Sequence, residues 1–417
     1  DTVPESVSPN VKRLPQMYHC CSYTLQKYKR VTNMNLSTKQ VQELLDNFAK
    51  KPEGNKMLLE FSLNALMKAE REIFLEESKG NKGNGFRSVK GFGIGTQIDL
   101  HIPRDRMGLF KPVVQMLWQN QQSHLDELIF ELYGAGLTAR DLERIVHQVY
   151  GNNLSKSSIS RITNEFSEEM KDFRERKLDK HYPIVYADAI FLKVRRDTVA
   201  TEAFYVLLGV RPDTTREVLG IYNCPTESAS NWEDIILDLK KRNVSEVNLF
   251  VIDGLTGFDK AIEKSFPNAT IQKCVVHLKR NILNKVRTKD KEAIANDLKY
   301  VFDMGKKSDD LDSCLDRLSV FASRWSKIYA HIKKLPEKED INYYFSYIKY
   351  EPGIWRMIYT TNWIERLNKD FKRTTRMRNS MPSVESALTL LSKVAINANL
   401  AKYRYQVTSL KADPMFQ

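Results

Sequence analysis

The sequence predicts an α/β protein in which a mixed sheet follows a mainly helical N-terminal part. Three apolar, β-rich runs at 183–194, 202–211 and 216–223 are joined by polar turns short enough for an antiparallel meander. Helix and strand patterns then alternate to about residue 276. Before residue 180, apolar residues recur instead at the three- and four-residue spacing of helices.

The composition indicates the class of partner. The chain has 417 residues, enough for two or three domains, and its 65 Lys and Arg against 52 Asp and Glu give a net charge of +13. This excess favours a polyanion, nucleic acid above all, although an ordinary basic enzyme would show the same balance. No apolar run approaches the roughly 18 residues that cross a bilayer, so no membrane partner is expected. The scattered cysteines indicate no disulfide framework and fit a reducing cytoplasm.

The N-terminal part is interpreted as an extension, a helical segment and a basic arm. Residues 1–35 match no element, and Met34 is a candidate natural start. Helical spacing follows from residue 37 to 78. The glycine-rich basic run 79–96 predicts a flexible arm that could lie along phosphates through residues such as Arg87 and Lys90. An exposed hairpin loop is the alternative, and a short strand at 97–103 comes next.

Residues 123–166 show the punctuation of a helix-turn-helix. A first helix breaks at Gly134 and Gly136, and a second begins at Thr138. Thr138 and Asp141 have the spacing of a capping box, which satisfies backbone N–H groups at a helix start. The pattern is typical of a DNA-binding unit.

The third helix of this unit is the candidate recognition helix. Ser155 is its predicted cap, with Leu154 and Ile159 as a hydrophobic staple. Ile159 and Ile162 would face inward, leaving a polar and basic face suited to phosphates and base edges. That face comprises Lys156, Ser157, Ser160, Arg161 and Asn164. A three-helix unit that makes no DNA contact is the alternative.

The elements after residue 180 have the order βββαβαβα. Beyond the meander, the order is completed by a helix at 228–242, a strand at 247–253, a helix at 257–265, a strand at 270–276 and a long helical region after it. It is the topology of an RNase H-like domain, in which the fourth strand pairs with the first. The charged, largely helical stretch 280–345 is interpreted as an insertion before the last helix of that domain.

Three carboxylates stand out in this arrangement. Asp188 interrupts an apolar strand, where an unpaired charge would cost several kcal/mol. Asp253 ends the fourth strand before Gly254, so strand pairing would make it a neighbour of Asp188. Glu365 begins a helix whose apolar stripe includes Leu367 and Phe371. Singly, each could be a satisfied strand residue or a solvated ion-pair partner.

Together, the three carboxylates predict a metal-dependent phosphoryl-transfer site. Hard cations such as Mg²⁺ or Mn²⁺ prefer oxygen ligands, and three carboxylates can hold two ions. Two ions can activate an attacking water or a DNA 3′-hydroxyl and stabilise the leaving oxygen. The basic side chains after Glu365 would hold the substrate's phosphates. They are Lys369, Lys372, Arg373 and Arg376.

Several ordered motifs resemble the Mutator-type transposases of bacterial insertion sequences, over about residues 36 to 400. They are "NGFR" (84–87), "IPRDRMGLFKP" (102–112), "YPIVYADAIFLKVR" (182–195), "VIDGLTGFDKAIEKSFPNATIQKCVVHLKRN" (251–281) and "IYTTNWIERLNKDFKRTTRMRNSMPS" (358–383). The resemblance implies a DDE triad in an RNase H-like fold, matched by Asp188, Asp253 and Glu365.

The resemblance also assigns secondary positions. The family's C-x-x-H signature falls on Cys274 and His277, which are expected to orient the site or the insertion. A zinc site is the alternative, although two ligands are half a tetrahedral set. Asn362 and Arg366 flank the glutamate as substrate contacts or supporting residues.

The function that the resemblance implies is that of a DNA transposase. It would bind double-stranded DNA with terminal inverted repeats through residues 36–180, act on target DNA, and work as a homodimer on DNA. A catalytically silent DNA-binding regulator and an RNase H-like structure-specific nuclease are the alternatives. The expected divisions are an extension at 1–35, a helical DNA-binding segment with the arm at 36–120, the helix-turn-helix at 121–180, the RNase H-like core at 181–279 and 346–417, and the insertion at 280–345.

Overall fold

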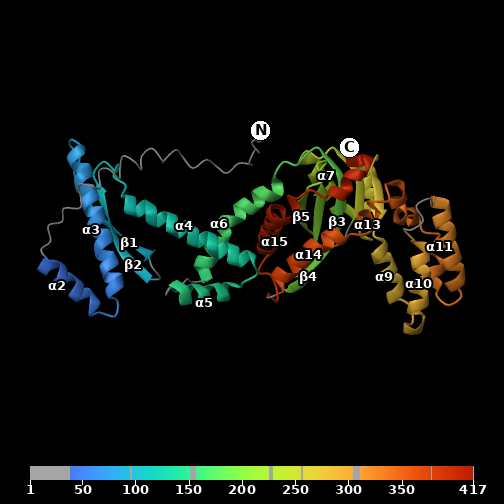
Figure 1. Ribbon diagram of the computed structural model, residues 1–417, viewed down its shortest axis with the longest axis horizontal. Coiled ribbons are helices and arrows are strands. Elements are labelled where there is room, and N and C mark those ends of the chain that lie inside the picture. The colour runs from blue at the N-terminus through green and yellow to red at the C-terminus, as the bar shows by residue number, and fades with distance from the viewer. Residues whose placement is uncertain are drawn as a thin grey trace. The chain divides into compact units, whose positions relative to one another are not determined.

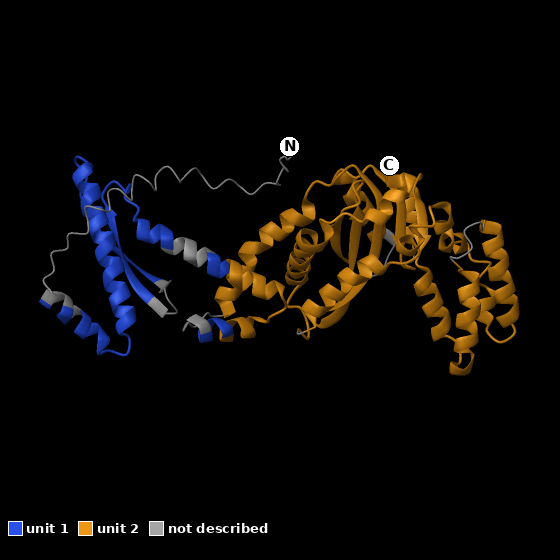
Figure 2. Cartoon of the chain, viewed as in Figure 1, with its two compact units in different colours: residues 1–126, 145–154 blue, residues 127–144, 155–417 orange. Residues whose placement is uncertain are grey.

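The computed structural model describes residues 38–93, 96–150, 156–224, 229–254, 257–303, 310–376 and 378–416. They belong to two compact units (Figure 2), residues 1–126 with 145–154 and residues 127–144 with 155–417. In the described part of the chain, no helix is both long enough and apolar enough to cross a membrane. The predictions for the N-terminal extension, Met34, Leu154 and Ser155 lie outside the described residues.

The first unit packs a long helix against a two-stranded antiparallel sheet. Its elements are α2 (Thr38–Ala49), α3 (Gly54–Glu77), β1 (Gly83–Gly93) and β2 (Thr96–Asp105). The core is small: Met67 of α3 packs with Ile98, Leu100 and Ile102, which alternate along β2. The alternation gives β2 one buried face, as strand periodicity requires.

The prediction of a flexible arm at 79–96 is wrong for the described residues, because most of them form β1. The backbone of β1 pairs with β2 from Gly83 to Gly93. Arg71 of α3 also donates from Nη1 to the carbonyl of Gly85 at 3.0 Å. Backbone pairing needs no apolar side chains from β1 itself, so the glycine-rich composition does not prevent it. Arg87 and Lys90 are exposed on this strand.

The three helices predicted as a helix-turn-helix are α4 (Val113–Gly134), α5 (Ala139–Tyr150) and α6 (Lys156–Glu175). The capping box is confirmed: the Thr138 backbone N–H donates to Asp141 Oδ2 at 3.0 Å, and the Asp141 N–H donates to Thr138 Oγ1 at 3.3 Å. On α6, Ile159 and Ile162 are buried as predicted. The five polar residues predicted for the outer face are exposed.

The second unit is built on a five-stranded mixed sheet (Figure 1). Its strands are β3 (His181–Arg195), β4 (Val199–Val210), β5 (Arg216–Cys224), β6 (Glu246–Ile252) and β7 (Thr270–Lys273), in the order β5-β4-β3-β6-β7. The first three strands are antiparallel, whereas β6 runs parallel to β3 and β7 parallel to β6. The prediction that the fourth strand pairs with the first is confirmed.

Helices cover both faces of this sheet. On one face, α7 (Ala229–Lys241) and α8 (Phe258–Ser265) bury Trp232 and Phe258 against the strands. On the other, α9 (Val275–Asn284), α14 (Asn362–Thr375) and α15 (Val384–Ala398) share one large apolar core with the sheet. The central strand β3 therefore has both faces buried, which explains its nearly continuous apolar sequence.

The helical character predicted for 280–345 is confirmed by three helices, α10 (Lys291–Val301), α11 (Leu311–Trp325) and α12 (Ala330–Lys333). The short helix α13 (Trp355–Ile358) leads to α14. The remaining single turns are η1 (Thr288–Asp290), η2 (Ile341–Tyr344), η3 (Ser346–Lys349), η4 (Asn399–Tyr403), η5 (Thr408–Ala412) and η6 (Pro414–Phe416).

Candidate catalytic site

Strand register makes Asp188 and Asp253 neighbours. In the parallel pair β3–β6, Ala187 is the partner of Ile252, the last residue of β6. Asp188 is the next residue of β3, and Asp253 directly follows the end of β6. The two carboxylates therefore lie at the carboxyl end of β6, where open α/β sheets bind ligands.

His277 connects Asp253 with Glu365. Its Nδ1 lies 3.1 Å from Asp253 Oδ1, and its Nε2 lies 3.7 Å from Glu365 Oε1. The first contact is an ion pair rather than an aligned hydrogen bond, because Nδ1 has no acceptor in hydrogen-bond geometry. Asp253 also accepts a hydrogen bond from the Gly254 N–H at 2.6 Å. Carboxylates from the residue after β6 and from α14 thus converge on the imidazole of α9.

Helix α14 positions Glu365 by burying its apolar stripe. Ile364, Leu367 and Phe371 are fully buried against the sheet, as their spacing predicts. Just before the helix, the Thr361 hydroxyl lies 3.4 Å from both Glu365 Oε1 and Cys274 Sγ, so it can donate to either.

Asn368 is a site residue that the sequence predictions missed. Its Nδ2 donates to Asp188 Oδ2 at 2.7 Å, while the Ala189 N–H donates to Asp188 Oδ1 at 2.8 Å. Asn368 is 5% exposed, and its Oδ1 is buried without a hydrogen-bond partner. The available signal was its position four residues after Ile364, on the apolar stripe, where an amide needs a polar partner.

The environment of Asp188 opposes its ionisation. The carboxylate is 8% exposed, and its burial is the main reason why the pKa of Asp188 is raised to about 6. The charges of Asp253 and Glu365 raise this pKa further, whereas the Ala189 N–H and His277 lower it. The charges of Asp253 and Glu365 are therefore close enough to Asp188 to disfavour its ionisation.

His277 supplies positive charge to the site. Its contact with Asp253, followed by that with Cys274, raises the pKa of His277 to about 10, so the imidazole is protonated at neutral pH. Burial acts to raise the pKa of Asp253, but His277 and the Gly254 N–H outweigh burial and lower it. Contacts with His277 and Thr361 likewise outweigh burial and lower the pKa of Cys274. His277 thus contacts two of the carboxylates, while Cys274 lies behind it beside Thr361.

The oxygen donors suit a hard divalent cation, but they do not form a finished ligand cage. Among the described residues, no group of three or more His, Cys, Asp or Glu side chains is arranged to hold a metal ion. The imidazole of His277 lies between two of the three carboxylates instead. The carboxylate oxygens fit Mg²⁺ or Mn²⁺ once the side chains adjust. For the zinc alternative, Cys274 and His277 would supply two of the four ligands that a tetrahedral site needs.

The other residues predicted for α14 lie on its outer surface. Asn362 and Arg366 are exposed, and so are the four basic residues predicted to hold phosphates. The Asn362 N–H donates to Thr360 Oγ1 at 3.2 Å. Of the three carboxylates, only Glu365 belongs to α14, and Lys369 and Lys372 follow it on the same side of the helix at spacings of four and seven residues.

The sequence of this chain is similar to those of known proteins over most of its length. The family model "Transposase, Mutator family" matches residues 26–404. The transposase for insertion sequence element IS905 of Lactococcus lactis subsp. lactis (strain IL1403) is 31% identical over 355 residues, 82% of this chain and 89% of the relative. The transposase for insertion sequence element IS1201 of Lactobacillus helveticus is 32% identical over 377 residues, 87% of this chain and all of the relative. Among solved structures, the Drosophila P element transposase strand transfer complex aligns over 70% of this chain and 93% of that chain, with a TM-score of 0.40 and 10% identity.

Proposed function

We propose that this chain, which belongs to the Mutator family and is a transposase of insertion sequence elements, cleaves and joins DNA strands. The residues that we assign to these reactions are Asp188, Asp253 and Glu365. The observation that carries this proposal is the convergence of Asp253 and Glu365 on His277, beside Asp188. We interpret the second unit as RNase H-like, an interpretation supported by the strand order and by the parallel pairing of β3 with β6.

The family implies a divalent metal, and we assign two Mg²⁺ or Mn²⁺ ions to the three carboxylates. Two such ions supply Lewis acidity at the attacking and leaving oxygens of a phosphodiester. The protein's own contribution is to orient the ligands. Asn368 and the Ala189 N–H fix both oxygens of Asp188, and the Gly254 N–H fixes Asp253. His277 and the Gly254 N–H outweigh burial and lower the pKa of Asp253, which favours the charged form that a cation requires.

DNA is the substrate that this assignment requires. We propose that residues 36–180 bind terminal inverted repeats, that a second DNA serves as the target, and that two copies of the chain act together on DNA. The exposed polar face of α6 and the exposed basic side chains of α14 support phosphate contacts. The net charge of +13 favours the same partner.

The test is strand cleavage and strand transfer by the purified protein on the terminal DNA of its element, with Mg²⁺. Asp188→Asn should abolish both reactions and leave DNA binding intact, because it removes a ligand charge without changing shape. Asp197→Asn is a matched control, since Asp197 is exposed in the turn after the same strand. Persistent nicking by Asp188→Asn would refute the assignment. If the wild type cleaves DNA without joining it, the alternative of an RNase H-like nuclease would be favoured. If it binds DNA without cleaving it, the alternative of a catalytically silent regulator would be favoured.

A further inference from the structure

We propose that Arg216 and Arg366 form a binding site for a backbone phosphate of DNA, beside the helix that carries Glu365. This proposal rests on the proposed function and extends it to residues outside the carboxylate cluster. The site lies where the start of β5, helix α14 and turn η4 meet.

Arg216 contacts two aromatic rings. Its guanidinium lies 5.0 Å from the ring centre of Trp363 and 4.9 Å from that of Tyr403. The rings fix the plane of the group, as stacked arginines require for bidentate contacts. Its hydrogen bonding is incomplete, because Nε is buried without a partner and Nη2 reaches only the Lys402 carbonyl, at 3.5 Å. The guanidinium is therefore oriented by its neighbours, while among the described residues its hydrogen bonds to the protein are few and long.

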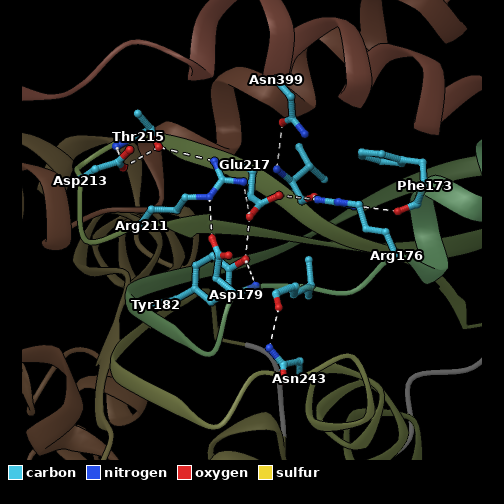
Figure 3. A network of polar contacts seen from close by, with 12 residues as sticks. Phe173, Arg176, Asp179, Tyr182, Arg211, Asp213, Thr215, Glu217, Asn243 and Asn399 are labelled. Atoms are coloured by element: carbon cyan, nitrogen blue, oxygen red, sulfur yellow. Dashed lines mark hydrogen bonds and ion pairs between the residues drawn. The ribbon is translucent and has the colours of Figure 1, made fainter. Parts of the chain in front are cut away.

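The next residue on β5 neutralises two half-buried arginines (Figure 3). Glu217 points to the opposite face of the strand and pairs with Arg176 and Arg211, each at 2.6 Å. Arg211 also contacts Asp179 at 2.8 Å. In contrast, within the described part of the chain no carboxylate lies at ion-pair distance from Arg216. Among the described residues, the arginines on the Glu217 side of the strand are thus paired with carboxylates, whereas Arg216 on the other side is not.

A second arginine follows Trp363, the ring that Arg216 contacts, by one turn of α14. Arg366 is exposed on α14, one turn after Trp363, and no carboxylate among the described residues pairs with it. Burial and the charge of Arg366 both lower the pKa of Arg216, so the two cations repel one another. Asp370, one turn further along α14, is already bound to Lys402 at 2.6 Å. Two neighbouring guanidinium groups without an acid are stabilised by an external anion.

A phosphodiester is the anion that fits this position. It accepts the paired N–H groups of arginine, and it carries one charge that both side chains can share. Trp363 and Arg366 belong to the same turn of α14 as Glu365, so a DNA strand bound at the carboxylates would pass close to a phosphate held there. The contact would position the strand without reading its sequence.

The experiment measures how salt affects the affinity of the full chain for terminal DNA, with Ca²⁺ in place of Mg²⁺ and fluorescence anisotropy as the readout. One phosphate contact contributes about 0.9 to the slope of log affinity against log salt, which corresponds to about eightfold at 0.1 M salt. Arg216→Gln and Arg366→Gln should each lose about this factor and reduce the slope by about one. The double variant should lose less than the sum, because both side chains hold one phosphate.

Arg211→Gln is the matched control. It removes a half-buried arginine from the adjoining network, so it should lower the melting temperature and leave the salt slope unchanged. If Arg216→Gln behaves like this control and Arg366→Gln binds like the wild type, Arg216 is only a structural clamp and the proposal is wrong. Should Arg216→Gln fail to fold, the exposed Arg366→Gln variant decides alone.

Wild-type protein that cleaves DNA while both variants keep the full slope refutes this site but not the proposed function. Wild-type protein that neither binds nor cleaves terminal DNA overturns both.

Discussion

Replacing Asp188 by asparagine should make the protein more stable while it abolishes catalysis. The carboxylate is 8% exposed, and the pKa of Asp188 is raised from 3.8 to about 6, mainly by burial. Each unit of such a change corresponds to about 1.4 kcal/mol, so the charged form costs the fold about 3 kcal/mol near neutral pH. The amide of Asp188→Asn carries no charge and avoids this cost.

Hydrogen bonding at the site supports the same direction. The Ala189 N–H now donates to one oxygen of Asp188, and Asn368 Nδ2 donates to the other. The Asn368 Oδ1 atom is buried without a partner, so a flipped Asn368 amide could accept a hydrogen bond from the new Nδ2. We therefore expect a net gain of about 2 to 3 kcal/mol rather than a loss.

The dependence on pH identifies the cause. Because the folded pKa of Asp188 is higher than the unfolded value, its penalty is absent below about 4 and complete above about 6. Wild-type stability should thus fall as the pH rises through this window, and the advantage of Asp188→Asn should grow with it.

Urea unfolding in EDTA at pH 5 and pH 7.5 measures this difference through tryptophan fluorescence, since four of the five tryptophans lie in the second unit. A variant less stable than the wild type at pH 7.5, or a gain that does not change with pH, would refute the reasoning.

Three further changes test other parts of the site and its support. Asn368→Ala should slow single-turnover cleavage at least tenfold with unchanged DNA affinity, because Asp188 loses its buried amide donor; equal rates would contradict a positioning role. Protonated His277 has a raised pKa of about 10, so its contribution to stability is present below about 6.5 and is lost as the pH rises through 10. The wild-type melting temperature should accordingly drop between pH 8 and pH 10, and His277→Gln should show no such drop. Gly136→Ala should cost more than about 2 kcal/mol, because φ is +109° and the added Cβ would lie 2.7 Å from the Thr374 carbonyl oxygen; Gly80→Ala, also at positive φ but in open space, should cost only about 1 kcal/mol.

The sequence was sufficient to predict the sheet around the carboxylates. Its strands are long apolar runs with clear turns, and a buried aspartate in such a run needs a chemical reason. The apolar stripe of α14 likewise fixed which face of that helix is buried and on which side Glu365 lies.

Other features depend on tertiary contacts that no local pattern contains. β1 forms because its backbone pairs with β2, so its glycine-rich sequence gave the wrong expectation. Asn368 acquires its role only when α14 lies against β3, and the contact of His277 with Glu365 joins residues far apart in the chain. Arg216 is distinguished because no carboxylate among the described residues pairs with it, which spacing along the sequence cannot reveal.

The central claim is that Asp188, Asp253 and Glu365 bind the same pair of cations. Anomalous scattering from Mn²⁺ in crystals of the protein with its terminal DNA measures this directly. We predict manganese peaks in contact with oxygens of all three carboxylates. Manganese bound by other side chains, with the three carboxylates directed at separate places, would contradict the account.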